Sequence, residues 1–219
     1  MYRTALQRGS LLCVRPAVAP TPHRMAFLAS SSRGYANAVD VLTHDHKEVK
    51  RLFSSIENAK DQNEISKHLQ LLVENLSKHA ELEEQVLYPA LRNISGKPDL
   101  ADRSLTEHQR MKDALYKLDQ TPSDRVGDRE FMATFKQLKE ETLHHIEEEE
   151  GEVFEVLKQR MGAQDLEDMG SLIETLKPMA PTHPHPSAPN TPPWNTMAAP
   201  LASFMDRMKD LGRKMAGKA

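Results

Sequence analysis

The sequence predicts an all-α protein: an antiparallel, up-down-up-down four-helix bundle with a short fifth helix and an amphipathic C-terminal extension. Three observations carry this prediction. Apolar residues recur at steps of three and four through four long segments, which is the spacing of one buried helix face. Of the 219 residues, 28% are charged, only 5% are aromatic and 9 are glycine, and this composition suits a helical bundle better than a sheet. The second half of the bundle also repeats the first.

The bundle is expected over residues 38–160. Its four helices are predicted at about residues 38–59, 64–93, 99–118 and 128–161. Short stretches of turn-forming residues separate them, at residues 61–63, 96–98 and 121–122. Such short connections make successive helices antiparallel. Pro89 lies in the last turns of the second helix and is predicted to kink that helix or end it early.

Three further segments follow the bundle. Residues 161–177 are expected to hold an accessory helix, from about Asp165 to Lys177, that packs outside the four. Residues 178–200 are rich in proline and are predicted to run extended along a surface. Residues 201–219 form an amphipathic helix with a basic polar face. Through residues 201–216 it could dock on its own bundle, on a protein partner or on an anionic membrane surface, and docking on its own bundle is favoured.

Residues 1–35 are predicted to be a mitochondrial transit peptide. They hold five arginines and no acidic residue, and their longest apolar run is too short for a secretory signal. The order Arg33-Gly34-Tyr35-Ala36 resembles a processing site, so the mature chain is expected to begin near Ala36 in the matrix. Without these five positive charges the net charge is −8 rather than −3. An acidic chain of this kind argues against nucleic acid as a partner.

Polar residues interrupt the apolar face of the second helix. Its stripe of leucines continues, at the same spacing, onto His79 and Glu83. The fourth helix does the same at His145 and Glu149, 66 residues further along the chain. The same 66-residue shift aligns Tyr88 with Phe154. A buried carboxylate without a partner is costly, so each His-x-x-x-Glu is either a satisfied polar network or half of a metal site.

The first and third helices each add one histidine to a buried stripe. His46 follows Asp45 in the first helix, and His108 follows Glu107 in the third. A single histidine on an apolar face is usually a hydrogen-bonded core residue. Six such residues on four stripes, arranged in a repeat, instead predict a metal centre. Four imidazoles and two carboxylates suit a pair of iron-like ions, bridged by the two glutamates. The predicted ligands are His46, His79, Glu83, His108, His145 and Glu149.

Several neighbouring residues are candidates for lesser roles. Glu84 and Glu150 are adjacent to the predicted glutamate ligands in both copies, which favours a role in supporting the ligands. His44 and His144 are alternative ligands that the periodicity disfavours. His68 is expected on the exposed side of its helix. No tyrosine or tryptophan falls on the ligand stripes, so no aromatic redox relay is expected.

These motifs resemble the hemerythrin-like, HHE cation-binding domain over about residues 38–160. The resemblance is carried by Asp45-His46, His79-Ala80-Glu81-Leu82-Glu83-Glu84-Gln85-Val86-Leu87-Tyr88-Pro89, Glu107-His108 and His145-Ile146-Glu147-Glu148-Glu149-Glu150. It implies a four-helix bundle around a non-haem di-iron centre, with the six predicted residues as ligands.

One departure bears on function. Oxygen-carrying hemerythrins place a second histidine four residues along the third helix, where this chain has Lys112. The two irons are therefore expected to have similar ligand sets, which argues against reversible oxygen carriage. The resemblance favours a non-catalytic protein that buffers or senses iron, dioxygen, nitric oxide or another diatomic ligand. The alternatives are a di-iron oxidase or peroxidase-like enzyme, and an interaction protein with a structural metal.

Overall fold

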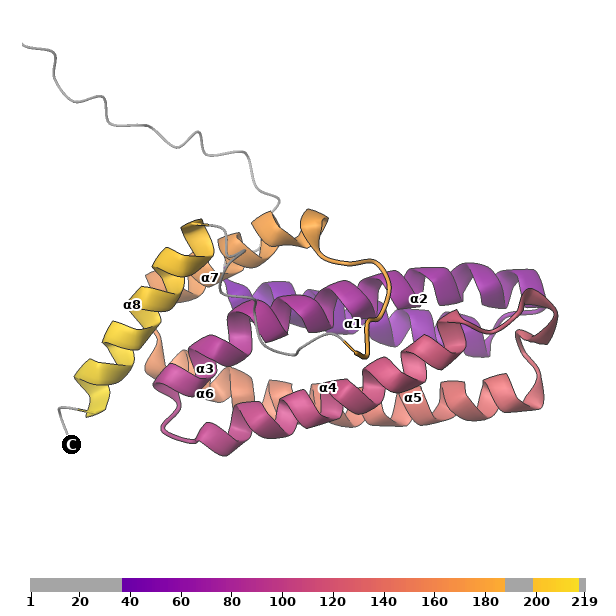
Figure 1. Cartoon of the computed structure of the whole chain (residues 1–219), viewed down its shortest axis with the longest axis horizontal. Coiled ribbons are helices and arrows are strands. Elements are labelled where there is room, and N and C mark those ends of the chain that lie inside the picture. The colour runs from indigo at the N-terminus through magenta and orange to yellow at the C-terminus, as the bar shows by residue number, and fades with distance from the viewer. Residues whose placement is uncertain (1–36, 188–198, 217–219) are drawn as a thin grey trace, which may run out of the picture. The chain divides into compact units, whose positions relative to one another are not determined.

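The computed structural model of the chain describes residues 37–187 and 199–216, which form helices and connecting turns with no strand in these two ranges (Figure 1). The predicted transit peptide, residues 1–35, lies outside the described residues. No helix of the described part is both long and apolar enough to cross a membrane.

Four long helices form the bundle: α1 (Ala38–Glu57), α2 (Gln62–Leu82), α4 (Pro98–Asp119) and α5 (Arg129–Glu148). The α1 helix packs on α2 and α4 packs on α5, with the chain reversing direction at each connection (Figure 1). Side chains of Asn37, Asp61 and Asp128 cap three of the helix starts by accepting hydrogen bonds from backbone amides. The all-α helical bundle predicted from the apolar spacing is confirmed.

A π-turn interrupts the second and the fourth predicted helix at the same place. The turn η1 (Glu83–Leu87) joins α2 to α3 (Tyr88–Ile94), and η3 (Glu149–Val153) joins α5 to α6 (Phe154–Arg160). The two turns begin at glutamates that align in the repeat. Glu155 stands where the first copy has Pro89, so the proline does not cause the interruption. The expected break at Pro89 is in fact a π-turn that ends one residue before Tyr88.

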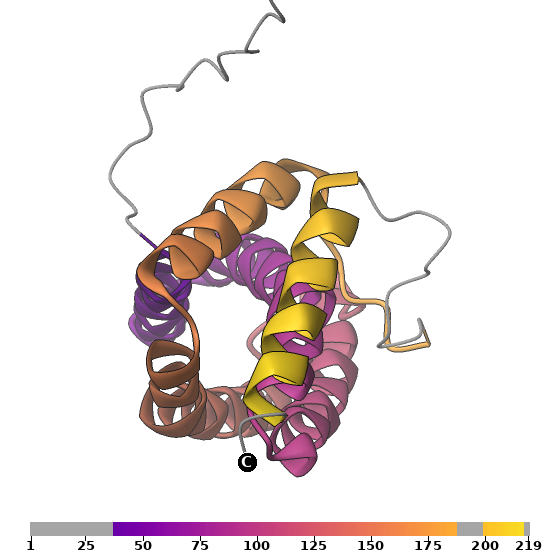
Figure 2. The same cartoon turned by 90° about the vertical axis from the view of Figure 1, so that its left-hand side faces the viewer.

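Two helices pack on the outside of the bundle, and Figure 2 shows both in one view. The α7 helix (Ala163–Leu176) lies on α1, and α8 (Ala199–Ala216) lies on α3. Phe204, Met205 and Met208 of α8 are buried, and Arg207 binds Asp168 of α7 at 2.6 Å. At Gly212 a Cβ would lie 2.1 Å from the carbonyl oxygen of Asn93, so only glycine permits this approach. The C-terminal helix therefore docks on its own protein.

Residues 180–187 form a strap of bends and turns across α2 and α4, and residues 188–198 of the predicted proline-rich linker lie outside the described residues. Short 3₁₀ turns precede the strap (η4, Lys177–Met179) and link α4 to α5 (η2, Ser123–Arg125). Lys177 binds Asp45 of α1 at 2.5 and 2.8 Å. On α4, Asp119 binds His183 at 3.0 Å and Gln109 donates to the carbonyl of Pro186 at 3.1 Å.

The core has two apolar clusters with a polar layer between them. One cluster contains Leu42, Val86, Ala101 and Val153, and the other contains Val49, Leu76, Met111 and Leu138. On α1, for example, Leu42 and Val49 lie on either side of His46. The layer itself holds the six predicted ligands, all at most 3% exposed: His46, His79, Glu83, His108, His145 and Glu149.

Candidate metal centre

The polar layer brings the six residues into two overlapping groups. His46, His79, Glu83 and Glu149 form one group, and Glu83, His108 and His145 form the other. Within each group, one ligand atom per residue lies within 4.8 Å of every other. The first group takes its histidines from α1 and α2, and the second takes them from α4 and α5.

The two glutamates face both groups. Oε1 of Glu83 lies 3.1 Å from Nε2 of His79, and its Oε2 lies 3.3 Å from Nε2 of His108. Oε2 of Glu149 lies 3.4 Å from Nε2 of His46 and 3.7 Å from Nε2 of His145. Each carboxylate is therefore placed between one histidine of the first group and one of the second, as a bridge between two cations requires.

Several of these buried atoms have no hydrogen-bond partner within the described part of the chain. Nδ1 of His79 is one of them, and it faces Asp45 at 3.8 Å. The others are Nε2 of His46, Nε2 of His79, both carboxylate oxygens of Glu83 and Oε2 of Glu149. Each unpaired buried polar group costs roughly 1–3 kcal/mol, and a charged group costs more. All of them except Nδ1 of His79 point into the same layer, where a metal cation would accept their lone pairs and offset the carboxylate charge. The residues present therefore fit a metal.

A second set of carboxylates turns the imidazoles inward. Nδ1 of His46 lies 2.9 Å from Glu150, and Nδ1 of His108 lies 2.9 Å from Glu84. When Nδ1 carries the proton and donates a hydrogen bond to the carboxylate, the lone pair of Nε2 faces the centre.

The remaining two imidazoles are faced by Asp45 and Glu107. Oε2 of Glu107 is 2.8 Å from Nδ1 of His145, and Oδ2 of Asp45 is 3.8 Å from Nδ1 of His79. In the sequence Asp45 precedes His46 and Glu107 precedes His108, so the contacts of these acids with His79 and His145 were missed. The 66-residue shift offered no signal for them, because Asp45 and Glu107 are 62 positions apart and are not aligned by that shift.

Comparisons with known proteins agree with this geometry. Residues 37–157 match the model of the hemerythrin HHE cation binding domain. That match covers more than half of the chain. The chain belongs to the hemerythrin HHE family.

Relatives of this hemerythrin-like chain include an uncharacterised hemerythrin-like protein of Schizosaccharomyces pombe. It is 30% identical over 177 residues, which are 80% of this chain and 86% of the relative. A DNA nickase of Nostoc sp. (strain PCC 7120) is 26% identical over 152 residues, 69% of this chain but only 42% of the nickase. No solved structure matches the chain.

Burial and neighbouring charges move the pKa values of the hemerythrin-like centre in both directions. Burial alone would lower the pKa of His145, but the charges of Glu149 and Glu107 outweigh it and raise that pKa. Burial lowers the pKa of His108 to about 4 and lowers the pKa of His79. Burial and the neighbouring Glu149 raise the pKa of Glu83 well above its usual value. Burial alone would raise the pKa of Glu149 too, but the charges of His145, His46 and His79 outweigh it and lower that pKa. A bound metal would displace the protons that these histidines and glutamates hold between them, since metal ligands are deprotonated.

The alternative histidines lie outside the polar layer. His44 and His144 are exposed. His144 groups instead with Glu107 and Glu148 near the surface. His68 is half-buried rather than exposed, and it does not join the ligand groups that the structure forms.

Tyr88 is the residue of the centre that sequence reasoning missed. Its hydroxyl donates to Oε1 of Glu149 at 2.9 Å and lies 2.9 Å from Nε2 of His108 and 3.4 Å from Nε2 of His145. The expectation that no tyrosine reaches the ligands is therefore wrong. The π-turn is the reason: the amide of Tyr88 donates to the carbonyl of Glu83, five residues back, so Tyr88 shares the face of Glu83.

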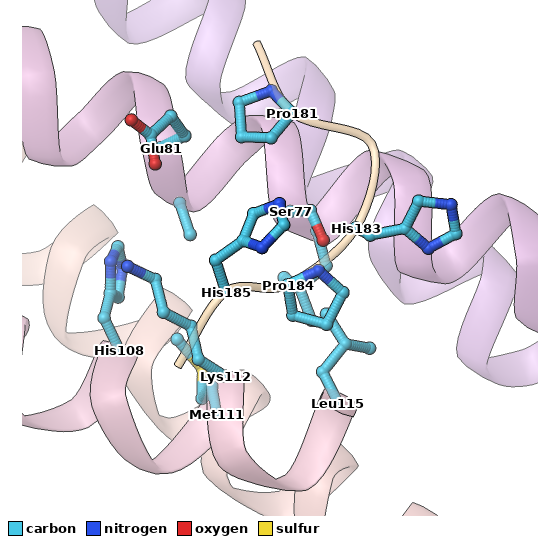
Figure 3. Close-up of a pocket in the computed structure, with 12 residues that line it drawn as sticks. Ser77, Glu81, His108, Met111, Lys112, Leu115, Pro181, His183, Pro184 and His185 are labelled. Atoms are coloured by element: carbon cyan, nitrogen blue, oxygen red, sulfur yellow. The ribbon is translucent and has the colours of Figure 1, made fainter. Parts of the chain in front are cut away.

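A small cavity lies beside the centre, between α2 and α4 and under the strap (Figure 3). Its volume is ≈ 20 Å³, about enough for one water molecule. Ala80, Met111 and Lys112 line it, and so do His108 on the side of the centre and His185 of the strap. Figure 3 shows Lys112 reaching toward His108, while His183 points away from the cavity.

Proposed function

We propose that the protein holds two non-haem iron ions in this centre and uses them to bind, buffer or sense iron, dioxygen or nitric oxide. The supporting observation is the set of six buried donors, several of them unpaired, shared between two overlapping groups. When bound, the ions supply one-electron redox chemistry and positions for a small ligand. The chain's own residues hold the Nδ1 protons of the imidazoles and exclude bulk water.

Metal analysis of aerobically purified protein, together with its electronic spectrum, tests this proposal. Two irons per chain and absorption from an oxidised iron pair are expected. One metal per chain, or a pair of zinc ions with no iron after growth in iron-rich medium, would overturn it.

The single histidine of the third bundle helix favours oxidation of the iron by dioxygen over reversible binding of dioxygen. The α4 helix offers His108 alone, and Lys112 stands four residues on, with its ammonium bound to Glu84 at 2.6 Å. Oxygen added to the ferrous protein should therefore produce a stable ferric state. The check is to purge the oxidised sample with argon and record the spectrum. Full return of the ferrous spectrum would restore oxygen carriage as the leading function.

A di-iron oxidase or peroxidase-like enzyme is the second candidate, and Tyr88 favours it. Its phenol lies 2.9 Å from a ligand nitrogen and is buried, so it could pass an electron to or from the centre. An assay of peroxide consumption with a chemical reductant separates the two functions. Many turnovers per iron pair, lost in Tyr88→Phe, would establish the enzyme. A single turnover supports binding or sensing.

The mitochondrial matrix is the proposed location, on the composition of residues 1–35. N-terminal sequencing of the protein from isolated mitochondria should find a start near Ala36. An intact Met1 would exclude this processing.

The charge of this chain argues against a DNA substrate such as the name of the nickase relative indicates. The residues after position 35 carry a net charge of −8, which repels a phosphate backbone. A protein partner or a membrane surface would meet the polar face of α8, where Lys209 and Arg213 lie, because its apolar face packs on α3.

A further inference from the structure

We infer that Tyr88 is itself a metal ligand, in the half of the centre that holds His108 and His145, and that the two metal positions are therefore inequivalent. This inference rests on the proposed di-iron centre and deepens it. The repeat aligns Tyr88 in one half of the centre with Phe154 in the other, so the two halves leave different positions open to a small ligand.

The spacing of atoms around the Tyr88 hydroxyl is that of a coordination sphere. Donor atoms that are about 2.1 Å from one ion and at right angles lie about 3 Å from each other. The Tyr88 oxygen is 2.9 Å from Nε2 of His108 and 2.9 Å from Oε1 of Glu149. The two imidazoles are themselves 3.0 Å apart, Nε2 to Nε2. These distances match neighbouring corners around one metal.

Hydrogen bonds alone do not satisfy this cluster when both imidazoles are neutral, as imidazoles that bind a metal are. Carboxylates face Nδ1 of both His108 and His145, which leaves the lone pairs of both Nε2 atoms turned to the centre. The phenol has one proton, and it donates that proton to Glu149. Two imidazole lone pairs and the phenol oxygen then converge without a donor between them. A cation resolves this convergence, and the phenol binds as phenolate, releasing its proton to solvent as metal binding generally does.

The other half of the centre has no equivalent oxygen. Phe154 occupies the position that aligns with Tyr88, and its amide likewise closes a π-turn, onto the carbonyl of Glu149. Its ring lies parallel to His46, with centroids 5.7 Å apart and planes 5° apart. The half with His46 and His79 therefore has one donor fewer, and its ligand position is bordered by an apolar ring. A small exogenous ligand belongs in this half.

The phenolate also sets a chemical difference between the halves. It adds one negative charge to the half with His108 and His145, which favours the ferric state there. This outcome differs from the equal ligand sets expected from the single histidine of α4. The missing histidine is replaced by an oxygen donor from the neighbouring helix α3.

The test uses the full chain loaded with ferric iron, with iron content measured first. An iron content below two per chain in the wild-type protein would contradict the proposed function, and not the assignment of Tyr88. With two irons present, the electronic spectrum should contain a phenolate-to-iron charge-transfer band, and Raman excitation within that band should enhance tyrosine ring modes. Two irons without either feature would overturn the assignment of Tyr88.

Three variants identify the tyrosine. Tyr88→Phe should keep two irons and lose the band, whereas Tyr116→Phe, on the exposed face of α4, should leave it unchanged. The chain has four tyrosines, so changing Tyr2, Tyr35 and Tyr116 to phenylalanine leaves Tyr88 alone. The band must persist in that triple variant, which tests the assignment even where Tyr88→Phe does not fold.

An azide titration of the ferric protein tests the inequivalence. Wild type should bind one azide per iron pair, in the half beside Phe154. Tyr88→Phe should bind a second one, because its loss opens the other half. Two azides per wild-type pair, or one per pair in both proteins, would refute the proposed difference between the halves.

Discussion

Lys112 donates a hydrogen bond from Nζ to Oε2 of Glu84 at 2.6 Å, within the buried layer beside the centre. The other oxygen of Glu84 lies 2.9 Å from Nδ1 of His108. Burial alone would raise the pKa of Glu84, but His108 and Lys112 outweigh it and lower that pKa. The lysine thus keeps the carboxylate charged, and the charged carboxylate orients the imidazole of His108 in the candidate centre.

Replacing this lysine by a neutral residue of similar length should weaken metal binding. In Lys112→Met the buried Glu84 loses its cation, so its pKa rises and its hold on the His108 proton weakens. We expect metal affinity to fall by roughly 10-fold to 100-fold, as for other residues that support a ligand. Competition against a chromophoric chelator measures this change.

The repeat supplies the matched control. Lys50 lies 3.5 Å from Glu150, the acid that faces His46, and the side chains of Lys50 and Glu150 are 43% and 37% exposed. Water screens that pair, so Lys50→Met should change the affinity only slightly. Equal losses in the two variants would show that the burial of Lys112 is irrelevant.

Removing a ligand should deplete the metal, and removing a nearby histidine should not. His79→Ala and His145→Ala each take one imidazole from the buried groups, whereas His68→Ala takes one from α2 outside them. Metal content after identical purification should fall well below two per chain in the first two variants and stay at two in the third. Equal metal content in all three would reject the ligand assignment.

In the metal-free chain, Glu83 by itself contributes a loss of stability as the pH rises. The pKa of Glu83 is raised by burial and by Glu149. Below the ordinary pKa of about 4.3 both states hold the proton. Above it the unfolded chain ionises first, so stability is lost until the pH passes the raised pKa of the folded chain.

Glu83→Gln removes this loss. In the absence of metal it should be more stable than wild type at pH 7, by about 1–3 kcal/mol, and no more stable at pH 4. Urea unfolding of chelator-treated proteins gives both values. Glu74→Gln, on the partly exposed face of α2, is the matched control. A Glu83→Gln protein that is destabilised at pH 7 would contradict the argument.

Much of this architecture could be predicted because the residues buried on one face of a helix recur every three or four positions in the sequence. The spacing of leucines located the bundle helices, and its continuation onto His79 and Glu83 located the polar layer. The π-turns could not be predicted in this way. Each adds one residue to a helical turn, which changes the later residues that face the core without changing the composition of the sequence. Tyr88 was therefore assigned to the wrong face, although its alignment with Phe154 was visible. Asp45 and Glu107 were missed because each is adjacent in sequence to a histidine other than the one it faces.

The last prediction concerns the strap over the cavity. Two hydrogen-bonding contacts hold it to α4: Asp119 with His183, and Gln109 with the carbonyl of Pro186. Loosening both should open the cavity that reaches His108. The single cysteine of the chain, Cys13, allows a direct measurement. In a Cys13→Ser background, Ala80→Cys places a thiol on the cavity wall, 5% exposed in the structure.

We expect a small thiol reagent to label Ala80→Cys slowly while the strap is in place, because the reagent must wait for the strap to lift. Adding Gln109→Ala and Asp119→Ala removes two contacts worth about 1 kcal/mol each, so labelling should be roughly 30-fold faster. Asp102→Asn is the control, since Asp102 lies on the same helix but pairs with Arg92. Rapid labelling with the strap intact would show an open cavity. An unchanged slow rate in the loosened variant would show that α2 and α4, and not the strap, limit entry to the centre.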